Sequence, residues 1–354
     1  MNDEETMKPA GNDRRDFLKG AALAAGAIAI SGNSLLGSER IGAKAGAIGR
    51  AARRTPLGDD GVVRMGIIGT GGMGGGHIGS FLQFATRGEE KVKIVAICDV
   101  NHKRRAVAES RINKAQGDEC AVYNDYLELL AREDIHGVLI ASPEHWHAQM
   151  AEDALMAGKD VYLEKPMTLR LPEALRLRQV VLNNPDVLLQ VGTQKIMLPK
   201  YKAAQAMVAE GAIGKPTFSQ TSYCRNSRDG EWKYYGIDPE WKPGVNVDWD
   251  RWCGPAGVRD WNPALCARWR RYKDFSTGIV GDLLVHEITP LMMALDQGWP
   301  TRVVATGGHY IDKAMENHDQ VNLQIQFEKG HTLIVAGSTC NEMGLETMIR
   351  GHEG

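Results

Sequence analysis

Short apolar runs alternate with amphipathic stretches over the part of the chain that follows residue 60. The apolar runs predict strands at residues 62–68, 92–98, 137–141, 160–163 and 187–191. The stretches between them predict helices at about 101–115, 126–131, 145–157 and 172–182. Runs that are apolar throughout are typical of strands buried on both faces of a parallel sheet. The alternation therefore predicts a doubly wound α/β sheet, with ligands at the carboxyl ends of its strands.

The pattern changes after residue 215. Residues 321–328 alternate apolar and polar side chains, a turn follows at Lys329-Gly330, and 331–336 form a second run. Together with 217–223 these runs predict a mainly antiparallel sheet, because strict alternation is typical of strands with one covered face. A helix at about 281–295 is the expected cover.

Residues 225–275 are expected to form a long irregular insertion, because they are rich in Pro, Gly and Asp. Six of the eight tryptophans lie here, at positions 232, 241, 249, 252, 261 and 269. Two interpretations of these rings are open: they stack on sugar rings, or they anchor the insertion to its own domain.

Composition and charge exclude several classes of protein. The 354 residues suffice for about two domains of roughly 150 residues each. Forty-two basic and 44 acidic side chains leave a formal charge of −2, which argues against nucleic acid or an anionic membrane as partner. The six cysteines form no Cys-x-x-Cys pair and no histidine pair has the spacing of a metal site, so we expect no metal. No apolar run reaches the ~18 residues of a membrane span, so stable membrane insertion is not expected.

The first sixty residues are expected to be a signal and a linker. Arg14-Arg15-Asp16-Phe17-Leu18-Lys19 precedes a short apolar run at 20–30, and Ala43-Lys44-Ala45 follows as a cleavage site. The pattern resembles a twin-arginine (Tat) signal, whose RRxFLK consensus it matches at every fixed position. It predicts a periplasmic or otherwise exported protein that the Tat machinery carries in folded form. The expected parts are 1–60 (Tat signal peptide and linker), 61–195 (Rossmann dinucleotide-binding domain) and 196–354 (substrate-binding α+β domain).

A Gly-x-Gly-x-x-Gly element, Gly69-Thr70-Gly71-Gly72-Met73-Gly74, follows the first strand. Its first glycine permits a tight turn, the second lets the backbone approach a pyrophosphate, and the third allows close packing of helix on strand. Asp99 ends the second strand, where a carboxylate accepts hydrogen bonds from the adenosine ribose. This carboxylate favours NAD, whereas the basic run Lys103-Arg104-Arg105 leaves NADP as an alternative.

The later strands also end in polar segments, namely 142–147, 164–166 and 192–194. We expect them to meet the cofactor, since such sheets bind ligands at these ends. For His145 and His147, local hydrogen bonds at a helix N-terminus are an equally open interpretation, and Trp146 packs against either the cofactor or the adjoining loop. The predicted cofactor contacts are Gly69, Thr70, Gly71, Gly72, Met73, Gly74, Asp99, Ser142, Pro143, His145, Trp146, His147, Glu164, Lys165 and Gln194.

In their order, these motifs resemble those of the Gfo/Idh/MocA family, which includes glucose–fructose oxidoreductase and inositol dehydrogenase. The matching elements are GTGGMG at 69–74, CD at 98–99, YNDYLELL at 123–130, SPEHWH at 142–147, EKP at 164–166, VGTQ at 191–194, GAIGK at 211–215, VDWDRWCGPA at 247–256 and GDLLVHE at 281–287.

The resemblance covers about residues 62–350 and implies a Rossmann domain followed by an open-faced α+β sheet. It also implies an NAD(P)-dependent oxidoreductase acting on a CH–OH group, with a sugar-type substrate at the nicotinamide. The Tat signal and the WDRW-type insertion are similar to those of the exported branch of the family. Members usually continue well beyond Arg350, so we expect the last strand and tail of the family to be missing here. A homo-oligomer is left open.

Three residues are the predicted catalytic group. Removing a hydride from an alcohol carbon needs a base for the hydroxyl proton, while the nicotinamide accepts the hydride. Asp282 and His286 are four residues apart, so a helix places them on one face. We expect the carboxylate to orient the imidazole, which takes the proton, and Lys165 to stabilise a developing alkoxide. Together with Tyr223 these three residues are the predicted substrate contacts.

The leading hypothesis is an exported oxidoreductase that acts on a sugar, polyol or glycoside and keeps its cofactor bound. Free NAD is not expected outside the cytoplasmic membrane, so the cofactor must be regenerated in place. Either two sugars exchange the hydride, or one substrate is oxidised and then reduced again. The resemblance links the second cycle to NAD-dependent glycoside hydrolases. A non-catalytic sugar-binding protein is a further alternative, which the joint presence of Lys165, Asp282 and His286 disfavours.

Overall fold

The computed structural model describes residues 52–354 of the chain. The predicted Tat motif, its apolar run and the expected cleavage site at Ala45 lie outside the described residues. Among the helices of the described part, none is both long and apolar enough to cross a membrane.

The first sheet has six parallel strands in the order β3-β2-β1-β4-β5-β6. The strands are β1 (Val63–Ile68), β2 (Val92–Cys98), β3 (Ala121–Tyr123), β4 (Gly137–Ile140), β5 (Asp160–Leu163) and β6 (Leu189–Val191). The strand order reverses between β1 and β4, and doubly wound sheets bind their ligands at such a switch point. The predicted sheet is confirmed, but the pattern does not predict β3, because three residues are too few to show a period.

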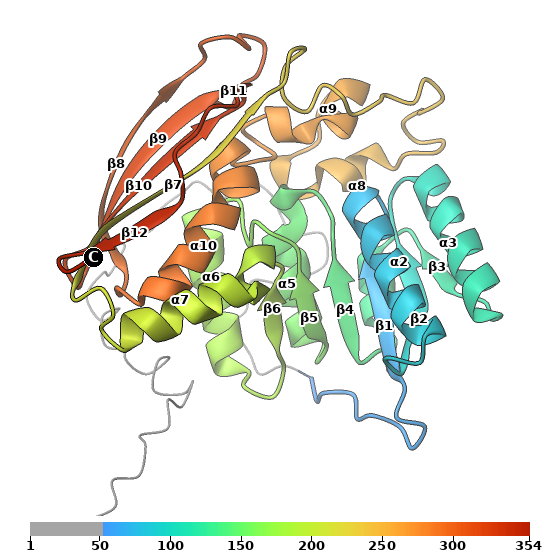
Figure 1. Ribbon diagram of the computed structural model, residues 1–354. Coiled ribbons are helices and arrows are strands. Elements are labelled where there is room, and N and C mark those ends of the chain that lie inside the picture. Colours follow the sequence, from blue (N-terminus) through green and yellow to red (C-terminus); the bar gives the residue numbers. More distant parts are fainter. Residues whose placement is uncertain (1–51) are drawn as a thin grey trace, which may run out of the picture. The chain divides into compact units, whose positions relative to one another are not determined.

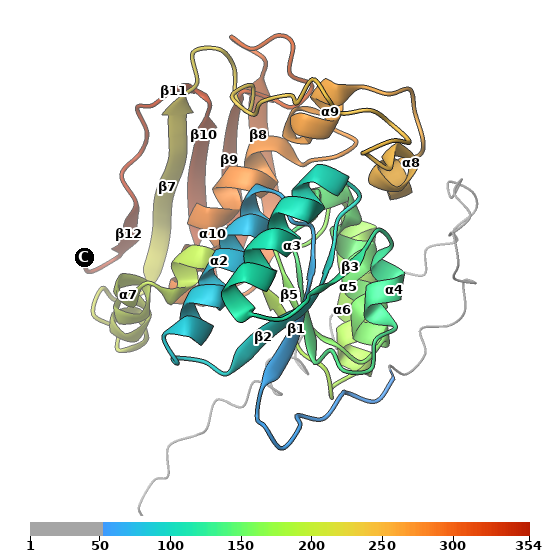
Figure 2. The ribbon, with the colours of Figure 1, turned by 90° about the vertical axis from the view of Figure 1, so that its right-hand side faces the viewer.

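Helices cover both faces of this sheet (Figures 1 and 2). They are α2 (Gly72–Thr86), α3 (His102–Gln116), α4 (Tyr126–Leu130), α5 (His147–Met156) and α6 (Leu171–Asn183). Ile78 of α2 packs with Ile67 of β1 on one face, and Leu155 of α5 packs with Ile140 of β4 on the other. Burial on both faces is the physical reason why these strands are apolar throughout.

The second sheet has the strand order β11-β7-β10-β9-β8, with β12 paired to β7. Its strands are β7 (Pro216–Asn226), β8 (Pro300–Gly308), β9 (Gln320–Phe327), β10 (Thr332–Ser338), β11 (Cys340–Asn341) and β12 (Met348–Gly351). The pairs are antiparallel except for β7 with β10, which confirms a mainly antiparallel sheet. The pattern does not predict β8, because this edge strand is exposed through Gly307 and has no buried face to impose an alternation.

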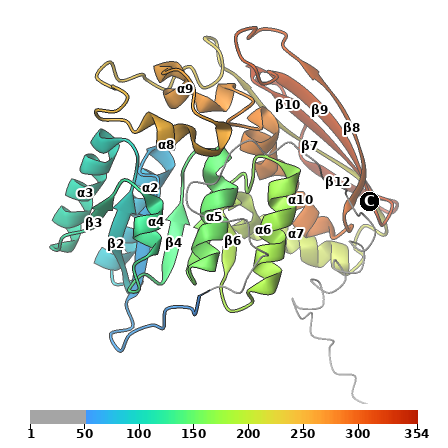
Figure 3. The same ribbon diagram turned by 180° about the vertical axis from the view of Figure 1, so that it is seen from behind.

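Two longer helices, α7 (Pro199–Ala209) and α10 (Val285–Leu295), accompany the second sheet. Figure 3 shows α10 between the two sheets. Leu291 of α10 packs on Leu333 of β10, so this helix covers the apolar face of the sheet. A π-helical turn at Val280–Leu284 leads directly into α10, so the helix expected at 281–295 is in fact two elements.

The insertion between β7 and the π-helical turn folds around an aromatic core of its own. It contains two short helices, α8 (Trp249–Cys253) and α9 (Pro263–Ala267). The buried aromatic residues of this core are Trp241, Trp249, Trp252 and Phe275. The rings of Trp249 and Trp252 are stacked with centroids 4.8 Å apart. The structure therefore supports anchoring of the insertion by Trp241, Trp249 and Trp252, although Trp252 also lines the cavity described below.

Candidate active site

A cavity of about 510 Å³ lies at the carboxyl ends of β1, β2, β4 and β5. Its wall also includes side chains from β7, the insertion and the π-helical turn. The structure brings together all four predicted substrate contacts there, namely Lys165, Tyr223, Asp282 and His286. The predicted cofactor contacts that line the cavity are Gly69, Gly71, Gly72, Met73, Asp99, Ser142, Pro143, Trp146, His147, Glu164, Lys165 and Gln194. Thr70, Gly74 and His145 do not line it.

The glycine element forms the turn from β1 into α2. A Cβ on Gly69, whose φ is +89°, would lie 2.7 Å from the carbonyl group of Ala141. A Cβ on Gly74 would lie 1.8 Å from the carbonyl oxygen of Gly69. Gly74 therefore packs helix against strand and is not a cofactor contact. Gly72 has open space where a Cβ would stand, so the cavity reaches the first turn of α2, whose free N–H groups favour an anion.

Asp99 holds this glycine turn in place. Its Oδ2 accepts hydrogen bonds from the Thr70 N–H at 2.8 Å and from the Thr70 hydroxyl at 3.0 Å, and its Oδ1 accepts one from the Asn101 N–H at 2.8 Å. Both donors of Thr70 are thus used by Asp99, so its expected contact with the cofactor stays a prediction. Asp99 itself lines the cavity, so its contact with the ribose stays a prediction.

Besides Nδ1 of His286, two buried polar atoms of the cavity wall have no hydrogen-bond partner among the described residues. They are Nδ2 of Asn101 and Oγ of Ser142. A buried polar atom left unpaired is unfavourable, so both positions favour a polar ligand. Together with the accessible start of α2 they fit a dinucleotide whose phosphates meet the glycine turn.

His145 is a structural residue, which corrects its expected role as a cofactor contact. Its Nε2 lies 2.9 Å from the carbonyl oxygen of Trp252, and its ring meets Phe275 edge-on. Burial lowers the pKa of His145 to about 3, so the imidazole is neutral. Trp146 lines the cavity and donates to the same carbonyl oxygen at 3.1 Å, so it packs against the adjoining loop.

His147 joins the ends of two strands. Its Nδ1 lies 2.6 Å from the carbonyl oxygen of Pro166, and its Nε2 lies 2.9 Å from that of Ser142. Burial lowers the pKa of His147, and a neutral ring donates to only one of these oxygens at a time. The ring thereby fixes the backbone next to Lys165.

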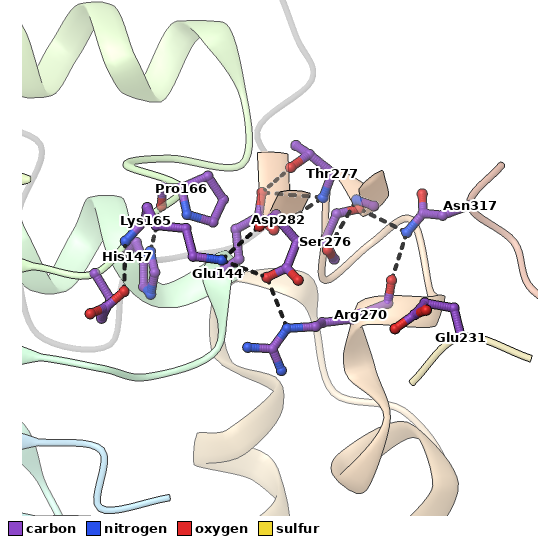
Figure 4. A network of polar contacts seen from close by, with 12 residues as sticks. Glu144, His147, Lys165, Pro166, Glu231, Arg270, Ser276, Thr277, Asp282 and Asn317 are labelled. Carbon is purple, nitrogen blue, oxygen red and sulfur yellow. Dashed lines mark hydrogen bonds and ion pairs between the residues drawn. The ribbon is translucent and has the colours of Figure 1, made fainter. Parts of the chain in front are cut away.

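Lys165, Asp282 and Arg270 form the central polar group of the cavity (Figure 4). Nζ of Lys165 donates to Oδ1 of Asp282 at 2.9 Å and to the carbonyl oxygen of the same residue at 2.8 Å. Nε of Arg270 donates to the same Oδ1 at 3.0 Å. Burial alone would raise the pKa of Asp282, but the charges of Arg270 and Lys165 outweigh it and hold the pKa below its usual value. The carboxylate therefore stays ionised.

Asp282 does not orient His286, contrary to the expectation from their spacing. Asp282 lies in the π-helical turn, which differs from the α-helix that the spacing argument assumes, and its carboxylate is taken up by two cations. Nδ1 of His286 is buried without a hydrogen-bond partner among the described residues. Burial and then the charge of Lys165 lower the pKa of His286, so its ring is neutral at pH 7 and able to accept a proton.

Glu144 is a buried carboxyl group to which the sequence assigns no catalytic role. Its oxygens accept hydrogen bonds from the Thr277 hydroxyl at 2.7 Å and from the Thr277 N–H at 3.1 Å. Burial raises the pKa of Glu144 to about 7. Because Thr277 precedes the π-helical turn, Glu144 links the end of β4 to the segment that carries Asp282 (Figure 4).

Arg270 is the main residue of the site that sequence reasoning misses, because it lies in the segment interpreted as an irregular insertion. Its guanidinium carbon lies 4.1 Å from the ring centroid of Trp269 and 5.6 Å from that of Tyr235. The signal that could have found it is the run of basic residues at 268, 270 and 271 beside an aromatic residue, shortly before Asp282.

Two family profiles match the chain. Residues 63–193 match a profile described as "Oxidoreductase family, NAD-binding Rossmann fold", and residues 255–354 match the GFO/IDH/MocA C-terminal domain. Together the two matches cover more than half of the 354 residues. The first match confirms the expected NAD-binding domain.

The curated relatives include glycoside hydrolases and inositol dehydrogenases. Glycosyl hydrolase family 109 protein 2 of Shewanella sp. (strain ANA-3) is 31% identical over 244 residues, which cover 65% of this chain and 49% of that protein. Inositol 2-dehydrogenase 1 of Saccharopolyspora erythraea is 31% identical over 167 residues, which cover 47% of each chain. The chain thus spans about half the length of these relatives.

Solved structures share the fold. The WlbA dehydrogenase from Bordetella pertussis, in complex with NADH and UDP-GlcNAcA, superposes with a TM-score of 0.64 at 19% identity, covering 82% of this chain and 77% of that one. GenD2 from gentamicin A biosynthesis, in complex with NAD, superposes with a TM-score of 0.62 at 19% identity, covering 86% and 73%. At these identities the likeness concerns the fold alone.

Proposed function

We propose that this protein, which belongs to the Gfo/Idh/MocA family of oxidoreductases, is exported and oxidises a CH–OH group of a sugar, polyol or glycoside with a tightly bound NAD. The observation that carries the proposal is a single cavity whose wall contains the glycine turn, Lys165 and His286. The curated relatives support the carbohydrate class, since their names include an inositol dehydrogenase and a glycosyl hydrolase.

Each residue of the polar group has a distinct task in this proposal. Bound NAD supplies the chemistry of hydride acceptance. His286 is neutral and accepts the hydroxyl proton of the substrate. Lys165 uses two of its three N–H bonds on Asp282 and keeps the third for the substrate oxygen, whose developing negative charge its ammonium stabilises. Asp282 positions Lys165.

Retention of the cofactor is part of the proposal, because free NAD is not expected outside the cytoplasmic membrane. The insertion supports it by binding the Rossmann domain at the end of β2, where the adenosine ribose is expected. The Asp248 N–H donates to the Val100 carbonyl oxygen at 2.9 Å, and the His102 N–H donates to the Asn246 carbonyl oxygen at 2.9 Å. Arg251 of the insertion also forms an ion pair with Asp125 at 2.7 Å.

A second candidate is NAD-dependent glycoside hydrolysis. It is favoured by the glycosyl hydrolase relatives, among them the alpha-N-acetylgalactosaminidase of Shewanella oneidensis, which is 29% identical over 245 residues covering 63% of this chain and 50% of that protein. In this cycle oxidation acidifies a neighbouring C–H, the aglycone is eliminated, water adds, and the ketone is reduced again. The cofactor then ends in the state in which it began.

One experiment separates the two candidates. The exported protein is purified with its bound cofactor and mixed with free sugars, polyols and nitrophenyl glycosides, while reduced nicotinamide and released nitrophenol are both followed by absorbance. Net reduction of the cofactor without nitrophenol supports the oxidoreductase. Repeated nitrophenol release without net reduction supports the hydrolase. If no compound produces either signal, both candidates are wrong.

A further inference from the structure

The central polar group of the cavity carries more positive than negative charge. Lys165 and Arg270 both bind one oxygen of Asp282, at 2.9 and 3.0 Å. The side chains of Lys165, Arg270 and Asp282 are only 10%, 19% and 9% exposed, so water screens the group weakly. Two cations and one carboxylate leave a formal charge of +1, and an unbalanced charge in such a place is unfavourable.

Among the described residues, Asp282 is the one acid that binds Arg270. Asp125 is paired with Arg251 at 2.7 Å, and Glu164 contacts His77 at 2.6 Å and accepts a hydrogen bond from the backbone N–H of Lys165 at 3.2 Å. Glu144 accepts hydrogen bonds from Thr277, and burial raises its pKa to about 7, so it is only partly ionised at neutral pH. A ligand with one negative charge would pair with Arg270, which no second carboxylate of the described residues binds.

The guanidinium of Arg270 offers the matching donors. Its Nε is used by Asp282, whereas its Nη1 and Nη2 have no hydrogen-bond partner among the described residues. Figure 4 shows these two nitrogens directed away from Asp282. The rings of Trp269 and Tyr235 flank the guanidinium, at 4.1 and 5.6 Å, and both residues line the cavity. The two Nη groups form a planar fork, the geometry that binds a carboxylate through two parallel hydrogen bonds.

We infer that Arg270 binds a carboxylate of the substrate, and therefore that this site acts on sugar acids in preference to neutral sugars. The inference rests on the proposed function, because it assigns a substrate class to the same cavity. A carboxylate carries one negative charge and balances the +1 charge of Lys165, Arg270 and Asp282. A phosphate monoester carries about −1.5 to −2 and would leave these residues and the ligand with a net negative charge. The cofactor phosphates are not the ligand of this fork, since they belong at the glycine turn and the start of α2.

The test compares matched acid and neutral sugars on the full-length exported protein with its bound cofactor. The pairs are D-galacturonate with D-galactose and D-glucuronate with D-glucose, and D-galactose 6-phosphate represents the phosphate class. Binding is measured by calorimetry and oxidation by reduction of the bound cofactor. The variants are Arg270→Gln, Arg270→Lys, which keeps the charge but loses the fork, and Lys273→Gln. Lys273 is an exposed residue of the same segment and controls for the loss of one positive charge.

We expect wild-type protein to bind at least one of the acids about tenfold to hundredfold more tightly than its neutral partner, the range of a charge-assisted hydrogen bond. Arg270→Gln should abolish this preference, Arg270→Lys should reduce it, and Lys273→Gln should keep it. Cofactor occupancy and the melting temperature show whether each variant is folded.

Equal binding of acid and neutral sugars by the wild type, failure to bind either acid, or a preference that survives in folded Arg270→Gln protein would overturn the inference. Tighter binding of the sugar phosphate than of the acids would overturn the assignment to a carboxylate. Acid-selective binding without any reduction of the cofactor would leave the inference standing and count against the proposed function. Oxidation of neutral sugars without a preference for acids would support the proposed function and overturn the inference.

Discussion

The ammonium nitrogen of Lys165 lies 2.9 Å from Oδ1 of Asp282, although the two residues are 117 positions apart. A second bond, to the carbonyl oxygen of Asp282, fixes the direction of the Lys165 side chain. The contact joins the end of β5 in the first sheet to the π-helical turn that leads into α10. Because this ion pair is buried, the relative position of the two segments depends on the charges of Lys165 and Asp282.

Replacing Asp282 by Asn should destabilise the protein by about 3 kcal/mol or more, because Lys165 and Arg270 then lose the carboxylate between them. The pKa of Asp282 lies below its usual 3.8, so the ionised carboxylate stabilises the fold above that pH and this contribution is lost as the pH falls further. Urea unfolding at neutral and acidic pH measures both effects. Asp274→Asn is the control, since Asp274 forms a pair with Arg259 whose side chains are 57% and 32% exposed. Equal free energies of unfolding for the two variants would contradict the prediction.

Replacing His286 by Ala should lower the single-turnover rate about 10²–10⁴-fold while cofactor occupancy stays unchanged. Since burial and Lys165 lower the pKa of His286 below its usual 6.5, the wild-type rate should fall only at pH values below 6.5, where the ring becomes protonated. The pH profile of cofactor reduction checks this point. His318→Ala, which removes an exposed histidine, should retain the wild-type rate. If the His286→Ala variant reacts at the wild-type rate, His286 is not the base, which should then be sought among Lys165, Tyr223 and His147.

Replacing Glu144 by Gln should change how stability depends on pH. The pKa of Glu144 is raised from 4.5 to about 7, so its contribution is fully present below pH 4.5 and is lost as the pH rises through about 7. A glutamine does not ionise, so the Glu144→Gln variant should not lose stability as the pH rises through this range. We therefore expect the melting temperature of Glu144→Gln, relative to wild type, to rise between about pH 5 and pH 8. A constant difference across that range would show that Glu144 is ionised throughout.

The purified protein should release mainly NAD when it is denatured, and Asp99→Ala should bind it less well. The carboxylate holds the glycine turn through Thr70 and repels a 2′-phosphate, so its loss should weaken binding and reduce discrimination against NADP. Chromatography of the released nucleotide and titration of the cofactor-free protein measure the two effects. Recovery of mainly NADP from wild-type protein would contradict the prediction.

Replacing Arg14-Arg15 by Lys-Lys should retain the protein in the cytoplasm, because the arginine pair is the core of the proposed Tat signal. Cell fractionation and immunodetection of the mature form measure the outcome. A block of the Sec pathway serves as the control and should leave export of the wild type intact. Efficient export of the Lys-Lys variant, or dependence on Sec, would argue for a different signal.

The sequence by itself determined the first sheet, its order of elements and the residues at its strand ends. Strands that are buried on both faces must be apolar throughout, and this run of apolar residues is visible in the sequence. The glycine turn has steric requirements that only glycine meets, so it is visible as well. Strand β2 at Val92–Cys98 has the bounds that the pattern predicts. The sequence does not predict β3 and β8, because a three-residue strand and an exposed edge strand show no distinct pattern of apolar residues.

Only the tertiary structure decided how the polar side chains pair. The spacing of Asp282 and His286 predicts a partnership, but two cations from distant segments compete for the carboxylate and the π-helical turn changes the helix geometry. Arg270 comes to the site from an insertion without periodicity, and the basic run around it does not by itself show that it pairs with Asp282. Burial likewise decides the pKa of each group, because desolvation depends on what packs around a side chain and not on its neighbours in sequence.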